Sequence, residues 1–84
     1  MNTYINEIIK VGVVFGGDKK VRPVWFVWKH REYRVKEITY SWTSRQGVVD
    51  IYHYAVSDFS GNIYELCYHA RSMIWTLHQV EFDE

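Results

Sequence analysis

Hydrophobic and polar residues alternate along this chain in short runs, and none of the runs shows the 3.6-residue spacing of an amphipathic helix. Val, Ile, Tyr, Phe, Trp and Thr dominate the runs, and turn-forming residues separate them at short intervals. Both features are typical of strands joined as consecutive hairpins. The pattern therefore predicts an all-β chain that folds as a single small antiparallel sheet of about five to six strands.

The first two predicted strands are bounded by clear turn signals. The first covers residues 3–15 and ends at Gly16-Gly17-Asp18, because glycine supplies the positive φ that a hairpin turn requires. The second begins near Pro23, whose missing N–H is tolerated at the start of a strand. Residues 24–28 are continuously apolar, as expected for a strand covered on both sides, and residues 29–31 form a tight turn.

The third predicted strand, residues 33–42, changes phase along its length. Its apolar residues belong to two parities, first Tyr33 and Val35, then Ile38, Tyr40 and Trp42. A bulge near Lys36-Glu37 would place all of them on the inner face. Such a bend lets a small sheet curl, so the sequence predicts a strongly bent, barrel-like domain of the size of an SH3 or OB fold.

The next two strands can be placed in register from one loop. If residues 59–61 form a three-residue loop with Gly61 in the left-handed conformation, Tyr54 faces Leu66. One apolar face then collects Tyr52, Tyr54, Val56, Tyr64, Leu66 and Tyr68. A slip by one residue would turn all of these side chains to the opposite face, so the shared apolar face supports this register.

The final strand is predicted to join the same apolar face. After a short loop, Trp75 is expected opposite Leu66. A second change of phase between Leu77 and Val80 would return Val80 and Phe82 to the core.

Composition and length fit one domain that spans residues 1–84. The chain is 48% hydrophobic and 18% aromatic, which is typical of a globular protein. Its single cysteine excludes an internal disulfide framework and favours a reducing, cytoplasmic location. We expect neither a signal peptide nor a membrane segment, because the first residues lack a signal pattern and no apolar run approaches ~20 residues.

Charge is segregated along the chain. Residues 19–45 carry eight basic and two acidic residues, a local charge of +6, whereas the whole chain has a net charge of zero. Together with one tryptophan, the cations define a candidate binding surface: Lys19, Lys20, Arg22, Trp25, Lys29, Arg31, Arg34, Lys36 and Arg45. Proteins that bind single-stranded nucleic acid combine such a positive groove with aromatics that stack on bases. In the alternative interpretation, the tryptophans belong to the core and the acidic later strands neutralise the cations.

A second candidate site lies on the face opposite the apolar one. There His53 faces Cys67, and His69 is a diagonal neighbour, so all three are potential zinc ligands. Their spacing matches no strong zinc signature, and His78 is expected opposite Ile63, too far away to be a fourth ligand. We therefore predict no metal or other cofactor and interpret the cluster as a polar patch beside a buried thiol.

Catalytic chemistry has weaker support. Cys67 and His53 form a nucleophile–base pair on paper, but both lie in the middle of strands, whereas catalytic residues usually lie on loops or strand ends. The sequence contains no phosphate-binding glycine loop, and its spacings build no arrangement of acid, base and nucleophile. We therefore predict a protein without enzymatic activity.

Two blocks of residues carry a resemblance to a known family. The first block comprises residues 22–28, residues 31–35 and Trp42, and the second comprises residues 54–56, 61–66 and 75–77 with Val80 and Asp83. In order and spacing they resemble a small bacterial β domain that occurs as stand-alone proteins. That domain is similar to the C-terminal segment of the catalytically inactive Y-family-polymerase-like proteins of mutasomes. The resemblance covers residues 21–83, and the chain departs from it at His30, where the turn pattern expects glycine.

The resemblance implies a non-enzymatic binding or adaptor module that is accessory to DNA repair or translesion synthesis. Its partner would be a protein, such as a member of a DNA-repair polymerase assembly, contacted through an aromatic patch or an edge strand. The family supplies no catalytic residues. Direct binding of single-stranded nucleic acid through residues 19–45 is the alternative hypothesis, and a metal or thiol site at His53, Cys67 and His69 is a more distant one.

Overall fold

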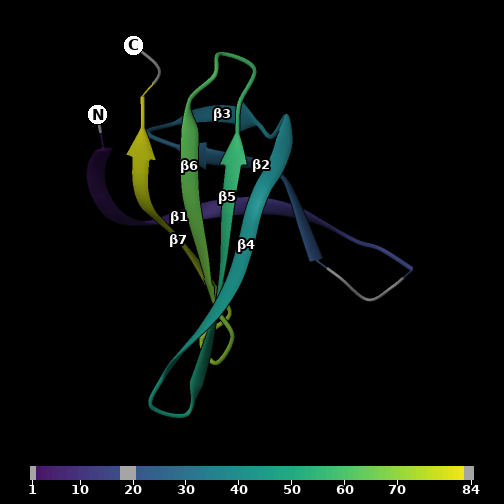
Figure 1. Ribbon diagram of the computed structural model, residues 1–84, viewed down its shortest axis with the longest axis vertical. Helices are drawn as coiled ribbons and strands as arrows, with labels where there is room; N and C mark the ends of the chain where they lie inside the picture. Colours follow the sequence, from purple (N-terminus) through teal and green to yellow (C-terminus); the bar gives the residue numbers. More distant parts are fainter. Residues whose placement is uncertain (1, 18–20, 83–84) are drawn as a thin grey trace.

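The computed structural model describes residues 2–17 and 21–82, which form seven strands. The strands are β1 (Asn2–Phe15), β2 (Val21–Trp28), β3 (Arg31–Arg34), β4 (Glu37–Gln46), β5 (Val49–Ser57), β6 (Ile63–His69) and β7 (Ile74–Glu81). They build one antiparallel sheet in the order β3-β2-β1-β7-β6-β5-β4 (Figure 1). The predicted all-β class and single antiparallel sheet are confirmed. The described residues include no helix with the length and apolar character needed to cross a membrane.

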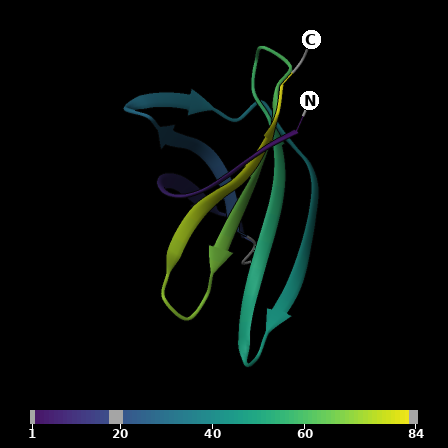
Figure 2. The same cartoon turned by 90° about the vertical axis from the view of Figure 1, so that its left-hand side faces the viewer.

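Strand β1 divides the sheet into two parts because it pairs with a different neighbour along each half. Residues 2–9 pair with β7, and residues 10–15 pair with β2. The first ladder is interrupted by a bulge at Asn6, whose φ is 54°. Strands β1, β2 and β3 consequently run across β4–β7 (Figures 1 and 2).

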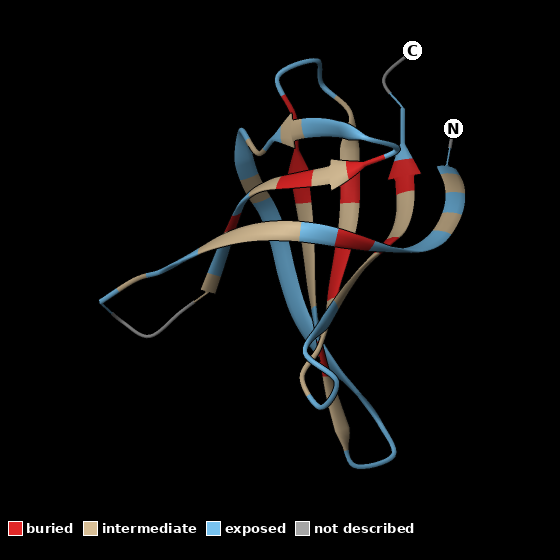
Figure 3. Cartoon of the chain, turned by 180° about the vertical axis from the view of Figure 1, so that it is seen from behind, coloured by how far each residue is buried: buried red, intermediate tan, exposed pale blue. Residues whose placement is uncertain are grey.

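The hydrophobic core lies where these two parts cross (Figure 3). Both parts contribute buried residues: Ile9, Phe26, Trp28, Val56, Tyr64, Leu66, Leu77 and Val80. The ring of Phe26 contacts those of Tyr33 and Tyr64, with centroids 5.1 Å and 4.9 Å away. Alternation along each strand turns these side chains to one face, so β2 and β3 cover part of β5–β7 with aromatic rings.

The sheet has seven strands instead of the predicted five to six, and it stays open instead of bending strongly into a barrel. The predicted third strand is in fact two strands, β3 and β4, separated at Val35 and Lys36. The Val35 N–H donates to the carbonyl oxygen of Val24 in β2. The next N–H, that of Lys36, donates to Ser57 in β5. The phase change is therefore a passage from one edge of the sheet to the other, and the ladders place β3 and β4 at opposite edges.

A bulge lies further along β4 than predicted and reverses the faces of its aromatic residues. The register shifts between Ile38 and Tyr40, so Thr39 is the extra residue, and its hydroxyl donates to the carbonyl oxygen of Ala55 at 3.0 Å. Ile38 packs against the core, whereas Tyr40 is 67% and Trp42 36% exposed. The prediction that Tyr40 and Trp42 face the core is wrong, because the bulge turns both to the outer face.

The predicted register of β5 and β6 is confirmed. Tyr54 pairs with Leu66, and Gly61 has the expected positive φ, at 90°. Asp58 stabilises the loop between these strands, because its carboxylate accepts hydrogen bonds from two backbone N–H groups of the loop. The same carboxylate accepts a hydrogen bond from the hydroxyl of Tyr64 at 2.6 Å.

Strand β7 keeps its predicted face with a shifted register. Trp75 pairs with Tyr68, two residues from the predicted partner, and a shift of two residues preserves the face of every side chain. A register shift beside Leu77 returns Val80 to the core, as predicted. Phe82 lies outside the core and is 41% exposed, so its predicted burial is wrong.

Candidate functional sites

The outer face of β1, β2 and β3 gathers part of the predicted cationic surface. Gly12, Trp25 and Arg34 pair in one row across these strands. The Trp25 ring covers Gly12 so closely that an added Cβ would lie 2.0 Å from it. Lys10 Nζ lies 5.7 Å from the ring centroid, and Arg22 is exposed further along β2. Trp25 is therefore half-buried beside cations, and one of them, Lys10, lies outside the predicted basic stretch of residues 19–45.

The other predicted cations lie elsewhere. Lys29 lies in the β2–β3 turn and Arg31 directly after it, and each lies over a neighbouring aromatic ring. Lys36 is exposed on the segment between β3 and β4. Lys19 and Lys20 lie outside the described residues. The structure thus brings Arg22, Trp25 and Arg34 onto one face but does not gather the whole predicted set.

The acidic later strands neutralise the predicted cationic surface at one position only, among the described residues. Arg45, at the far end of β4, forms an ion pair with Asp50 of β5 at 3.2 Å. Among the described residues, this is the one ion pair between a cation of the predicted surface and a carboxylate. Among the described residues, no carboxylate forms an ion pair with the cations beside Trp25, so an external ligand can contact them.

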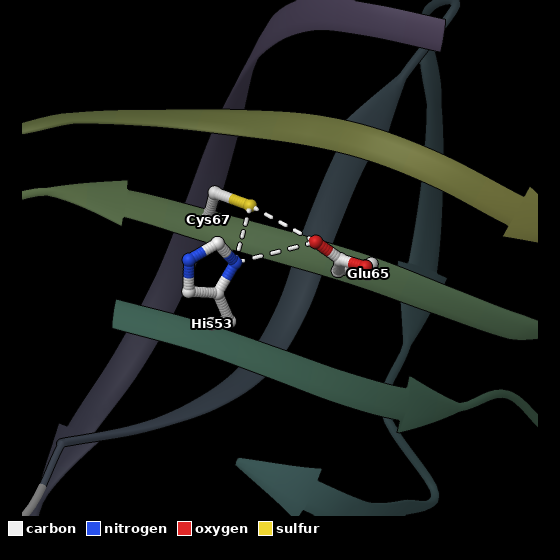
Figure 4. Close-up of side chains that lie close together, drawn as sticks. All are labelled: His53, Glu65 and Cys67. Atoms are coloured by element: carbon white, nitrogen blue, oxygen red, sulfur yellow. Dashed lines mark hydrogen bonds and ion pairs between the residues drawn. The ribbon is translucent and has the colours of Figure 1, made fainter. Parts of the chain in front are cut away.

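A polar cluster lies on the outer face of β5 and β6. His53 pairs with Cys67 across the two strands, as predicted, and Glu65 lies two residues before Cys67 on the same face. His53 Nδ1 is 3.2 Å from Glu65 Oε2 and 3.3 Å from Cys67 Sγ, and Sγ is 3.6 Å from Oε2 (Figure 4). The three atoms that could bind a metal ion therefore lie close together, although Glu65 was not among the predicted ligands.

Neighbouring side chains contact His53 and Glu65 on the sides that point away from the cluster. Ser44 Oγ lies 2.7 Å from His53 Nε2, on the ring edge opposite the cluster. Gln79 Nε2 donates to Glu65 Oε1 at 2.8 Å, which leaves Oε2 for the cluster. The Trp42 ring stacks on the His53 ring at 4.8 Å with an interplanar angle of 4°. The bulge in β4 makes this contact possible, because it turns Trp42 to the outer face.

The third predicted ligand, His69, lies near the cluster but outside it. Its Nε2 is 3.3 Å from Thr76 Oγ1. Both residues line an open pocket of about 320 Å³ together with His53, Cys67 and His78. His78 reaches this pocket because it is the extra residue at the bulge in β7, whereas the predicted register placed it opposite Ile63.

The charge of the cluster depends on the thiol. Burial, followed by the negative charge of Glu65 and a hydrogen bond to it, raises the pKa of Cys67 to about 12. In the absence of a cation, Cys67 is therefore a neutral thiol that donates to Glu65 at neutral pH. A protonated, buried thiol is a poor nucleophile, so the electrostatics do not favour covalent catalysis at this position.

An aromatic groove opens on the inner face, beyond the part that β2 and β3 cover. It has a volume of about 770 Å³ and is lined by Val13, Phe15, Val21, Thr43, Tyr52, Tyr54, Tyr68, Met73 and Trp75. The Trp75 ring lies 5.0 Å from Tyr68 and 5.7 Å from Tyr54. Sequence reasoning placed these aromatics on the core face correctly but did not foresee that one end of that face stays open.

Comparison of the chain with protein-family models, with curated proteins and with solved structures found no match. Function is therefore inferred from the surfaces themselves. These are the aromatic groove, the cationic face around Trp25, and the cluster of His53, Glu65 and Cys67.

Proposed function

We propose that this protein is a non-enzymatic binding module whose ligand is a proline-rich, extended segment of a partner protein. The observation that carries the proposal is the aromatic groove of about 770 Å³, whose lining includes no formally charged residue among those described. Its volume falls within the roughly 300–1,000 Å³ of ordinary ligand sites. Such a groove favours an uncharged ligand, because a phosphate chain would find no cation among the described lining residues.

The chemistry of the lining fits a polyproline II ligand. Such a segment has no internal hydrogen bonds, presents its carbonyl groups outward, and docks in aromatic-lined grooves. Tyrosine hydroxyls and the Trp75 indole N–H supply donors beside apolar rings, which suits carbonyl acceptors between proline rings. Burial and the neighbouring Tyr52 raise the pKa of Tyr54, so its hydroxyl remains a neutral donor at physiological pH.

The resemblance to the mutasome proteins indicates where such a partner is to be sought. It makes a DNA-repair polymerase assembly the first source of proline-rich segments to test. The support for this cellular role is the residue pattern of the two sequence blocks, and the support for the binding mode is the groove. The two parts of the proposal can therefore fail separately.

An array of short proline-rich peptides, followed by calorimetric titration of the best binder, tests the binding mode. Tyr68→Ala should lower the affinity for that peptide about tenfold or more, because it removes a ring from the groove. A tenfold change in affinity corresponds to about 1.4 kcal/mol. Tyr40→Ala is the matched control, because Tyr40 is exposed on the outer face of β4. An array without any binder, or equal weakening by both variants, would contradict the proposal.

A second candidate function is supported by the cationic face. Lys10 and Arg34 lie beside the half-buried Trp25, and Arg22 is exposed on the same face further along β2. Single-stranded nucleic acid binds to such a combination of cations and a stacking ring. If this face binds an oligonucleotide, the affinity should fall as the salt concentration rises. A plot of the logarithm of the binding constant against the logarithm of the salt concentration should have a slope of about −0.7 per phosphate contacted. Arg34→Glu, and Lys36→Glu to a smaller extent, should weaken this binding. Arg45→Glu, on a distant hairpin, is the control, and no binding at low salt would exclude this function.

A further inference from the structure

We propose that His53, Glu65 and Cys67 form a binding site for a divalent transition-metal ion, with Zn²⁺ as the best fit. Their donor atoms come from two adjacent strands and converge on one point of the outer face (Figure 4). This site is independent of the aromatic groove, which lies on the opposite face of β5–β7. It adds Glu65 to the ligand set and removes His69 from it.

The distances within the cluster match those around a tetrahedral ion. Zn²⁺ binds nitrogen and oxygen at about 2.0–2.2 Å and sulfur at about 2.3 Å, so ligand atoms at tetrahedral angles lie about 3.3–3.7 Å apart. The three separations in the structure are 3.2, 3.3 and 3.6 Å. A metal ion therefore fits at the centre if the separations from His53 Nδ1 widen by about 0.1–0.3 Å, while the separation of Sγ and Oε2 already matches.

The ligands are positioned by their neighbours. Metal-binding histidines usually use their other ring nitrogen for a hydrogen bond, and ligating carboxylates are commonly bonded at their free oxygen. Here Ser44 contacts Nε2 of His53, and Gln79 donates to Oε1 of Glu65. Both contacts leave the atoms that face Cys67 free to bind the ion. Trp42 stacks on the imidazole and restricts its rotation.

The charges of the cluster also favour a divalent cation. On binding, the ion would replace the proton of the Cys67 thiol, which leaves to solvent, and a metal–thiolate bond would form. One thiolate, one carboxylate and a neutral imidazole then balance the charge of the ion. A thiolate ligand selects Zn²⁺ over the hard cations Mg²⁺ and Ca²⁺, which prefer oxygen.

Three protein ligands leave a fourth tetrahedral position for water or another small ligand. His53 and Cys67 both line the pocket of about 320 Å³, so that position faces an accessible space. An open coordination position of this kind distinguishes the site from a closed structural zinc site with four protein ligands. His69 and His78, which line the same pocket, would surround a ligand bound there.

Titration with Co²⁺ of the untagged, chelator-treated protein tests the proposal. Wild-type protein should bind a single ion per chain, with a thiolate-to-cobalt charge-transfer band and the intense visible bands of tetrahedral Co²⁺. Cys67→Ser should lose the charge-transfer band, and Glu65→Gln should weaken binding at least tenfold. Ser44→Ala and Gln79→Ala, which change only the supporting contacts, should weaken binding by about 10–100-fold.

His30→Ala is the matched control, because His30 is exposed in the β2–β3 turn and belongs neither to the cluster nor to the lining of its pocket. It should bind Co²⁺ like the wild type. The wild-type spectrum decides the question even if a cluster variant fails to fold. A wild-type titration without the charge-transfer band, or a band that persists in folded Cys67→Ser, would overturn the proposal.

Discussion

The two ends of the inner face of β5–β7 have similar residues but differ in burial. At one end, Tyr64 and Leu66 are sealed beneath Phe26, with relative exposures of 1% and 0%. At the other end, Tyr52 and Trp75 line an open groove, and Tyr52 is 37% exposed. The alternation of residues is the same at both ends. The difference is that the aromatic rings of β2 and β3, those of Phe26 and Tyr33, pack only on the first end.

This difference shows that alternation decides the face of a side chain, while coverage decides its burial. Coverage here depends on where β1 leaves β7 and begins to pair with β2, near Ile9 and Lys10. Aromatic residues that extend the core pattern past that point line the open groove, for which we propose a ligand.

The largest effect is expected for Leu77→Ala at the covered end. Leu77 is completely buried, so truncation should leave a cavity and lower the free energy of unfolding by about 2–5 kcal/mol. Trp75→Ala at the open end removes more atoms, but its ring is only partly buried and its removal widens the groove instead of leaving a closed cavity. It should therefore cost less per atom removed than Leu77→Ala. Urea denaturation of both variants measures the difference, and a greater loss per atom for Trp75→Ala would mean that the open end is part of the sealed core.

The second effect concerns a polar contact at the covered end. Tyr64→Phe removes the hydroxyl that donates to Asp58 at 2.6 Å, and it leaves a buried carboxylate oxygen without this donor. Loss of a hydrogen bond to a buried charged group should lower the free energy of unfolding by about 1–3 kcal/mol. Chemical denaturation against the wild type measures it. An unchanged stability would show that Asp58 finds another donor.

The sequence was sufficient for the parts of the fold that depend on local signals. Gly61 identified the β5–β6 loop, and the alternation on both sides of it placed His53 opposite Cys67 correctly. Strand class and the inner face followed from the same periodicity. Each of these features is determined by residues close together in the chain, because turn geometry sets the register of a hairpin.

Features that depend on distant contacts could not be predicted. The passage at Val35 and Lys36 has the same sequence signature as a bulge, and only its hydrogen bonds to β2 and β5 distinguish them. Likewise, Lys10 joins the cationic face from outside the basic stretch. Glu65 lies two residues before Cys67 and therefore on the same face, but its approach to His53 depends on side-chain rotamers that spacing does not reveal.

The third prediction tests the Asp58 loop with pH. Burial alone would raise the pKa of Asp58, but hydrogen bonds from Tyr64, Asn62 and Ser60 together lower it below its ordinary value. The folded-state pKa thus lies below the unfolded one, near 3.9. The carboxylate stabilises the fold above that pH, and this contribution disappears as pH falls through the folded-state pKa. Unfolding free energies of wild type and Asp58→Asn should therefore converge in acid, and a constant difference would contradict the assignment.

The smallest effect is expected for Tyr52→Phe at the open end. Tyr52 is more than one-third exposed, and its ring lies 6.4 Å from that of Tyr68 at the border of the open groove. Removing its hydroxyl should change the free energy of unfolding by less than about 0.5 kcal/mol, as for most surface substitutions. Denaturation measured beside Tyr64→Phe gives two identical chemical changes on one face of the sheet. If both variants lose the same stability, the ends do not differ in coverage, and the proposal of an open groove that binds a ligand would be contradicted.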